Sequence, residues 1–277
     1  MEQTYKAAAD IDVLPMYFPI PGFGSLPINA FVIKGEQPVL IDTGSPLDGD
    51  GADSTEHFMD SLRSVIDPAD LKWIWITHAD MDHVGSVQQI LKEAPDAKVV
   101  TTFLTVGRMS VFSPLPMDRV YLLNPGQSLD IGDRTLTSVQ PPSFDAADTA
   151  GLYDSKSKAF FSSDCFGALL PGQAEAAGDI AQADLEAGQL LWATIDSPWL
   201  HKVDSTTFAA SLNAIRQMDP ELILSSHLPA ARGMNERLLG TLATAPNATP
   251  WVGPDQEALM QMMAQITGDE SRAEVTV

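Results

Sequence analysis

The stretch that most constrains the fold of this chain is WIWITHADMDHVGS, residues 73–86, where an apolar run meets a cluster of polar groups. LKWIWIT (71–77) is apolar on both faces, as expected of a strand inside a sheet. His78, Asp80, Asp82 and His83 follow within six positions. At a strand-to-helix turn such side chains can converge, whereas along a straight strand they would point to opposite faces.

Clustered carboxylates repel one another unless cations neutralise them, so Asp80 and Asp82 in one small site imply bound metal. Two adjacent ions are the natural occupant of a cluster of this size. The alternative is a capping loop in which His78 and Asp80 serve the next helix, but capping needs one such residue and not four.

The remaining sequence alternates predicted strands and helices, which indicates an α/β protein of one domain, residues 1–277. The last ten residues are expected to fray. The predicted strands are 28–34, 38–42, 71–77, 97–102, 119–123, 134–140, 150–154, 158–163 and 221–226, and the predicted helices are 54–66, 84–94, 181–196, 205–217 and 235–244.

The charge of the chain excludes two classes of partner. Thirty-seven acidic and sixteen basic residues give a net charge of -21, so nucleic acid and anionic membranes would be repelled. The sequence has no apolar stretch of about 18 residues and its first residues lack the pattern of a signal peptide. The single cysteine, Cys165, cannot form an internal disulfide and is expected to be a small buried hydrophobe. A cytoplasmic location is therefore expected.

Two further metal-ligand types stand at predicted strand ends. Asp164 in SSDCFG follows the strand-like KAFF, and His227 in SSHLP follows ELIL. Taken singly, Asp164 could cap a helix and His227 could pack in the core, but their shared position favours a place in the metal site. His57 and His201 lie in helix-like or loop contexts, where surface or capping roles are expected.

Four motifs in order, LIDTG (40–44), HADMDH (78–83), SSDCFG (162–167) and SSHLP (225–229), resemble the metallo-β-lactamase superfamily. The resemblance covers nearly the whole chain and implies an αβ/βα sandwich. It implies that Asp42 supports the site without touching metal. It also implies two metal positions bridged by Asp164: one with His78, Asp80 and Asp145, the other with Asp82, His83 and His227.

The third motif position separates this chain from the hydrolases of the superfamily. They carry histidine where this sequence has Asp80, so the motif is H-x-D-x-D-H. It is similar to the H-x-E-x-D-H of flavodiiron proteins and of stand-alone oxygen-binding di-iron proteins. DHVGSVQQILKEAPDAKVV, LNPGQSLDIGDRTL and FFSSDCFG also look like this di-iron branch. A carboxylate-rich, thiolate-free set favours iron, with zinc or manganese as alternatives.

A second departure concerns the first metal position. The di-iron branch has a histidine ligand before a D-T pair, and in PPSFDAADT (141–149) the aligned residue is Asp145. Either Asp145 replaces that ligand, which makes the site unusually anionic, or the first metal is bound weakly. Asp148 is a less favoured substitute.

The resemblance implies a dinuclear protein that binds or reacts with dioxygen or nitric oxide as a sensor, a reductase component or an oxidase. Residues 1–277 are expected to hold no flavodoxin domain and no flavin, so a redox partner protein would supply electrons. The alternative is a hydrolase of esters, thioesters, lactones or phosphoesters that uses a metal-bound hydroxide. Asp82 is the candidate catalytic carboxylate in addition to being a ligand. A third hypothesis is a degenerate binding module.

Less is indicated about the surroundings of the site. Residues 15–31, rich in Gly and Pro, predict either an apolar lid or a hairpin packed on the sheet. Trp192 and Trp199 are expected in the core, with the wall of the site or a homodimer contact as alternatives.

Overall fold

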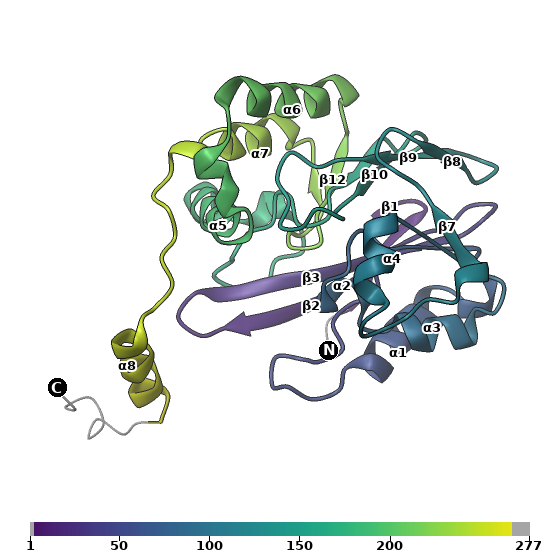
Figure 1. The fold of residues 1–277 in the computed structure, drawn as a ribbon, viewed down its shortest axis with the longest axis horizontal. Coiled ribbons are helices and arrows are strands. Elements are labelled where there is room, and N and C mark those ends of the chain that lie inside the picture. Colours follow the sequence, from purple (N-terminus) through teal and green to yellow (C-terminus); the bar gives the residue numbers. More distant parts are fainter. Residues whose placement is uncertain (1–2, 268–277) are drawn as a thin grey trace.

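The structure is a computed structural model in which residues 3–267 are described, so the expected fraying of residues 268–277 lies outside the described part. Two sheets pack face to face, and each is covered on its outer face by helices (Figure 1). This is the αβ/βα sandwich that the sequence predicted. The chain order of the motifs therefore places two motifs in each half of the sandwich.

The first sheet has the order β1 to β7. β1 to β4 pair antiparallel, whereas β4 to β7 pair parallel. Parallel neighbours bring their carboxyl ends to the same edge, which is where the first two motifs lie. The strands are β1 (Tyr5–Ala8), β2 (Ile11–Ile20), β3 (Gly24–Ile33), β4 (Val39–Ile41), β5 (Trp73–Trp75), β6 (Lys98–Thr101) and β7 (Val120–Leu122).

The second sheet has the order β13-β12-β11-β10-β9-β8, in which β11 and β12 are parallel and the other pairs antiparallel. Asp164 follows β11 and His227 follows β12, so the parallel pair delivers both residues to one edge. The strands are β8 (Ser128–Asp130), β9 (Thr135–Val139), β10 (Gly151–Asp154), β11 (Ala159–Phe161), β12 (Leu222–Leu224) and β13 (Ala231–Arg232).

Three buried clusters hold the layers together. The first lies between the β1–β7 sheet and its helices, and the second between the other sheet and its helices. The third fills the space between the sheets, where the rings of Phe31 and Phe161 meet edge to face with centroids 5.3 Å apart. The helices are α1 (Thr55–Val65), α2 (Met81–Val84), α3 (Val87–Glu93) and α4 (Phe103–Met109) on the first side, and α5 (Gln182–Asp196), α6 (Ser205–Met218) and α7 (Asn235–Leu242) on the second.

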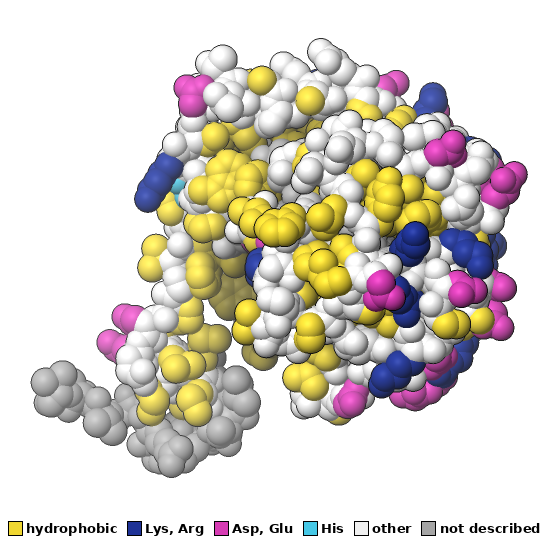
Figure 2. Space-filling model, turned by 45° about the vertical axis from the view of Figure 1, so that its right-hand side comes forward, with side chains coloured by type: hydrophobic (Ala, Val, Ile, Leu, Met, Phe, Trp, Pro, Cys, Tyr) yellow, Lys and Arg dark blue, Asp and Glu magenta, His cyan; other side chains and the backbone are white. Residues whose placement is uncertain are grey.

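Short 3₁₀ helices occupy several connections, and one further helix stands apart. The 3₁₀ helices are Pro68–Asp70, Met117–Arg119, Ala177–Asp179, Pro198–Lys202 and Ala245–Asn247. The eighth helix, α8 (Gln256–Thr267), extends away from the sandwich (Figure 1), and its hydrophobic side chains are visible at the lower left of Figure 2. Within residues 3–267, no helix is long and apolar enough to cross a membrane.

The prediction of one uninterrupted helix after the HADMDH motif was wrong. Residues 84–94 were expected to form a single helix, but α2 ends at Val84 and α3 begins at Val87. The N–H groups of Gly85 and Ser86 donate to the carbonyls of Gly44 and Thr43 instead. A side chain at Gly85 would place its Cβ 2.3 Å from the nitrogen of Pro46, so the helix break lets the LIDTG loop pack against the motif.

The segment 15–31 forms the β2–β3 hairpin, as one of the two alternatives predicted, with Ile20 paired to Gly24 across the turn. Cys165 is buried, as expected. The strands β1, β8 and β13 and the helices α4 and α8 were not predicted.

Candidate metal centre

The HADMDH motif lies at the point where β5 ends and α2 begins. His78 and His83 are completely buried, whereas Asp80 and Asp82 are partly exposed. Asp80 occupies the N-cap position of α2, but its side chain makes no capping hydrogen bond. The capping alternative therefore does not account for Asp80.

The side chains singled out in the sequence come together at one edge of the sandwich, between the two sheets. Their potential ligand atoms fall into groups whose members lie within 4.8 Å of one another. These groups match the sets implied by the resemblance, although metal ligation itself stays a prediction. The groups are His78, Asp80 and Asp145; Asp82, His83 and His227; and His78, His83 and Asp164.

Asp164 lies between the two sets. Its Oδ2 is 3.4 Å from Nε2 of His78, and its Oδ1 is 3.1 Å from Nε2 of His83 and 3.3 Å from Nε2 of His227. One oxygen thus faces each set, which is the arrangement required of a bridging carboxylate.

The most informative feature of the site is a set of buried atoms without hydrogen-bond partners. Nε2 of His78, Nε2 of His83 and Oδ1 of Asp164 are all buried, and none makes a hydrogen bond. Asp164 contacts the two rings at 3.4 and 3.1 Å, but these atoms lack the hydrogen bonds that buried polar groups normally make. Imidazole nitrogens and carboxylate oxygens aimed at a common space are the donors that transition metals take, so these residues fit a metal centre.

Neighbouring groups fix which nitrogen of each ring faces the site. Nδ1 of His83 is 2.8 Å from Oδ2 of Asp42, and Nδ1 of His227 is 2.7 Å from the carbonyl of Pro27. Donation of the Nδ1 hydrogen to these acceptors leaves Nε2 of each ring free as a ligand atom. Asp42 is also held by the N–H and hydroxyl of Thr77, at 2.9 and 2.8 Å.

The electrostatics of the metal-free site pair histidines with carboxylates. Burial lowers the pKa of His83, but the charges of Asp82, Asp164 and Asp42 reverse this and raise it well above its usual value. Burial also lowers the pKa of His227, but the nearby charge of Asp164 outweighs burial and raises this pKa to about 9. Burial raises the pKa of Asp164, yet the three histidines hold it well below its usual range.

Asp145 is the least tightly held member of the predicted set. Its Oδ1 is 3.9 Å from Nε2 of His78 and accepts a hydrogen bond of 3.2 Å from the hydroxyl of Thr149. Burial, reinforced by the charges of Asp164 and Asp80, raises its pKa. Asp148, the other aspartate of this loop, belongs to none of the groups among the described residues and instead accepts from Ala79 N–H at 3.0 Å.

Sequence reasoning missed two charged residues. Asp196, the last residue of α5, lies with Asp145 and Asp164 in a fourth cluster of possible ligands, which contains carboxylates only. Burial and then the charge of Asp164 raise the pKa of Asp196 to about 8. Arg108, on the unpredicted helix α4, pairs with Asp80 and Asp148. No local sequence pattern marks either residue, because both reach the site through tertiary packing.

The two tryptophans contribute to the surroundings of the site. The Trp192 indole packs 4.7 Å from the His227 ring and donates to the carbonyl of Asp164 at 3.1 Å. Trp199 packs against Phe144, next to Asp145, and donates to the Phe144 carbonyl at 2.7 Å. Trp192 therefore forms part of the wall of the site, which was the alternative to the expected position in the core. His57 and His201 belong to none of the groups found among the described residues.

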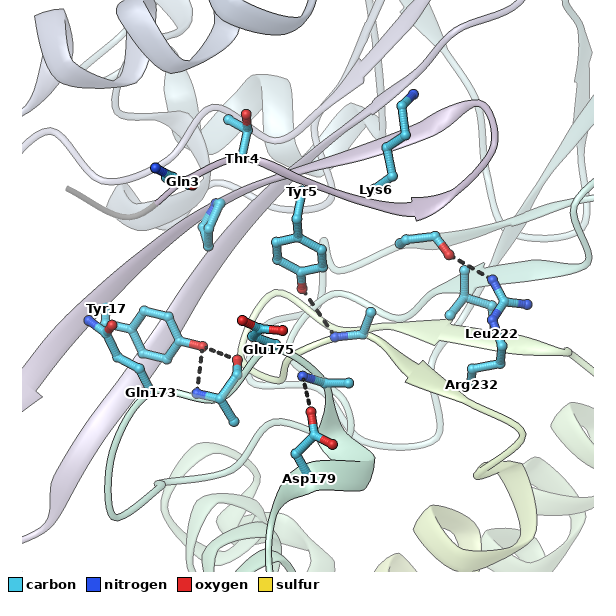
Figure 3. A pocket seen from close by; sticks show the side chains of 15 residues that line it. Gln3, Thr4, Tyr5, Lys6, Tyr17, Gln173, Glu175, Asp179, Leu222 and Arg232 are labelled. Atoms are coloured by element: carbon cyan, nitrogen blue, oxygen red, sulfur yellow. Dashed lines mark hydrogen bonds between the residues drawn. The ribbon is translucent and has the colours of Figure 1, made fainter.

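A separate cleft of about 750 Å³ lies between β1, the 173–179 segment and the β12–β13 region (Figure 3). Its polar groups largely bond within the protein: Tyr5 accepts from Ala230 N–H, Tyr17 donates to the Ala174 carbonyl, and Arg232 donates to the Ala7 carbonyl. Its basic and acidic side chains do not converge on one point (Figure 3), unlike the side chains of the His/Asp cluster.

The structure is thus a protein of the metallo-β-lactamase fold with clusters of His and Asp side chains that could hold metal ions. The family model described as ODP family beta lactamase matches residues 26–227, and the chain belongs to this family.

The chain is also similar to individual proteins. An uncharacterized protein of Methanocaldococcus jannaschii is 26% identical over 199 residues, 72% of this chain and 48% of that protein. The anaerobic nitric oxide reductase flavorubredoxin of Salmonella typhi is 31% identical over 140 residues, 50% of this chain and 28% of that protein. The chain thus spans half or less of these relatives. The rubredoxin oxygen:oxidoreductase of Desulfovibrio gigas superposes with a TM-score of 0.77 at 18% identity, over 90% of this chain and 63% of that one.

Proposed function

We propose that this protein binds two iron ions and, through them, binds or reacts with dioxygen or nitric oxide. The observation that carries the proposal is the trio of buried atoms on His78, His83 and Asp164 that make no hydrogen bond, in residues whose potential ligand atoms lie within 4.8 Å of one another. The similarity to a nitric oxide reductase and to an oxygen:oxidoreductase supports the choice of ligand gas.

The donor set supports iron over zinc. It contains three histidines, four aspartates and no thiolate, and the only cysteine is buried with a pKa that burial raises to about 12. The four carboxylates of Asp80, Asp82, Asp145 and Asp164 balance the charge of two divalent ions. Ferrous ions, when bound, supply the electrons and open coordination positions that a diatomic gas needs.

The protein's own residues would hold and shield this chemistry. Asp164 would supply one oxygen to each metal position, and Asp42 keeps the His83 ring in place through the 2.8 Å contact at Nδ1. The Trp192 indole packs against the His227 ring on one side of the site. Asp196, whose pKa of about 8 keeps it largely protonated at neutral pH in the metal-free protein, holds a proton beside the site.

Sustained reduction of either gas requires an electron donor, and we propose a redox partner protein in the cytoplasm for this role. A protein that binds gas without turnover would instead act as a sensor. Single-turnover and steady-state measurements with a chemical reductant separate the two roles.

Metal analysis of protein produced in iron-supplemented medium, with anaerobic absorption spectra before and after addition of dioxygen or nitric oxide, tests the proposal. About two irons per chain with a gas-dependent near-ultraviolet band support it. Zinc with turnover of an ester or thioester, or no metal at all, would refute it in favour of a hydrolase or a binding module.

A further inference from the structure

Arg108 forms two short ion pairs at the rim of the metal centre. Its Nη2 lies 2.6 Å from Oδ1 of Asp80, and its Nη1 lies 2.6 Å from Oδ1 of Asp148. The fork of a guanidinium can hold two acceptors at fixed separation, which an ammonium cannot. Arg108 therefore ties the third residue of the HADMDH motif to the loop that carries Asp145.

The second acceptor, Asp148, fixes the same turn from the other side. Its side chain is 1% exposed, and its Oδ2 accepts the N–H of Ala79 at 3.0 Å. A buried carboxylate of this kind needs a cationic partner, and Arg108 is that partner. Arg108 and Asp148 together hold the backbone between His78 and Asp80 as well as the Asp80 side chain.

The distribution of charge around the site also singles out Arg108. Within residues 3–267, Arg108 is the only arginine or lysine that forms an ion pair with a carboxylate of the predicted ligand set. Asp80 can keep this pair with one oxygen and offer its second oxygen to a metal, since a carboxylate accepts through both. Among the described residues, Arg108 is the only hydrogen-bond or ion-pair partner of the Asp80 side chain, which is 40% exposed.

We propose that Arg108 is a positioning residue for the first metal position: by holding Asp80 and Asp148 it orders the Asp80 carboxylate toward His78 and Asp145 before metal arrives. This inference rests on the proposed dinuclear function. Outer contacts of this kind typically change metal affinity by about 10- to 100-fold. The second position, with Asp82, His83 and His227, contains neither of the two carboxylates that Arg108 pairs with.

The test uses Mn²⁺, which suits an oxygen-rich set and is stable in air. Stepwise binding to the metal-free full chain is followed by calorimetry and electron paramagnetic resonance. Asp80→Asn first identifies the binding step that contains the first position. Arg108→Gln should weaken that step by about 10- to 100-fold and leave the other unchanged. Arg63→Gln is the matched control, because Arg63 is similarly exposed, pairs with Glu56 and Glu93 at 2.7 Å, and belongs to α1.

A double-mutant cycle separates positioning from general charge. Arg108→Gln should have a much smaller effect in the Asp80→Asn background, because Arg108 acts on the first position mainly through Asp80, with Asp148 as the lesser route. Arg108→Lys should bind like Arg108→Gln, since it keeps the charge but loses the fork.

The inference would be overturned if the effects of Arg108→Gln and Asp80→Asn on Mn²⁺ affinity were additive, or if Arg108→Lys bound Mn²⁺ like the wild-type protein. Tighter binding by Arg108→Gln would also overturn it, because Arg108 would then compete with the metal. Wild-type protein that binds fewer than two ions would instead refute the proposed function on which the inference rests.

Discussion

Replacement of the central carboxylate, Asp164→Asn, should remove both metals while leaving the shape of the side chain. The Asp164 oxygens face His78, His83 and His227 at 3.1–3.4 Å, so the same oxygens would face both ions. Two unit charges about 4 Å apart interact by about 4 kcal/mol at an effective dielectric constant of 20, and by about twice that for a divalent ion. If structural relaxation and water compensate for three quarters of this interaction energy, a loss of about 2 kcal/mol per ion remains. This corresponds to a decrease of about 30-fold in the affinity for each ion.

Metal content after desalting and Mn²⁺ calorimetry measure this loss directly. In the metal-free variant, the pKa of His227 should also fall from about 9, because Asp164 is the charge that raises it, and a nuclear magnetic resonance pH titration reports this. Asp196→Asn is the control, since it removes a neighbouring carboxylate that lies outside the predicted ligand set. An Asp164→Asn variant that binds both ions as tightly as the wild-type protein would refute the bridging role and the charge argument with it.

Three other outcomes are expected. His78→Ala and His83→Ala should each lower metal occupancy while circular dichroism stays native; full occupancy in either variant would make that histidine a packing residue. Asp145→His should raise occupancy of the first position, because neutral imidazole relieves the repulsion that raises the pKa of Asp145; unchanged Mn²⁺ affinity would show that Asp145 is not a ligand. The melting temperature of the metal-free protein should fall as pH rises from 6.5 to about 9. The raised pKa of His227 contributes stability that is complete below the unfolded-state pKa near 6.5 and is lost as pH rises through about 9. The melting temperature of the metal-loaded protein should change little over this range. A flat curve for the metal-free protein would contradict that linkage.

The strands that carry the site were predictable because they are buried on both faces. LKWIWIT and ELIL read as continuous apolar runs, and their ends located His78 and His227 without any structure. β1 and β13 were missed because they are short and partly exposed, so their sequences show no strong pattern. α4 was missed since Phe103 and Leu104, 70% and 52% exposed, mask the amphipathic period of a seven-residue helix.

The site was predictable to the extent that its chemistry is local. The HADMDH spacing placed four groups at one turn, and a shared strand-end position added Asp164 and His227. Arg108 and Asp196 could not be found in this way. Arg108 reaches Asp80 from 28 residues away, and Asp196 meets Asp164 only because α5 packs across the second sheet.

The charges of the metal-free site explain how such a cluster can fold before metal is bound. His83 and His227 face the carboxylates of Asp82 and Asp164, which raise the pKa values of both rings and so favour their protonated forms when no metal is bound. These protonated rings take the electrostatic place of a metal ion, so that the carboxylates are not left as uncompensated buried charges. Metal uptake must then displace these protons, because a ligating imidazole nitrogen cannot be protonated. The same residues that hold the metal therefore also preform its site, and the affinity for metal must rise with pH until His83 and His227 have lost their protons.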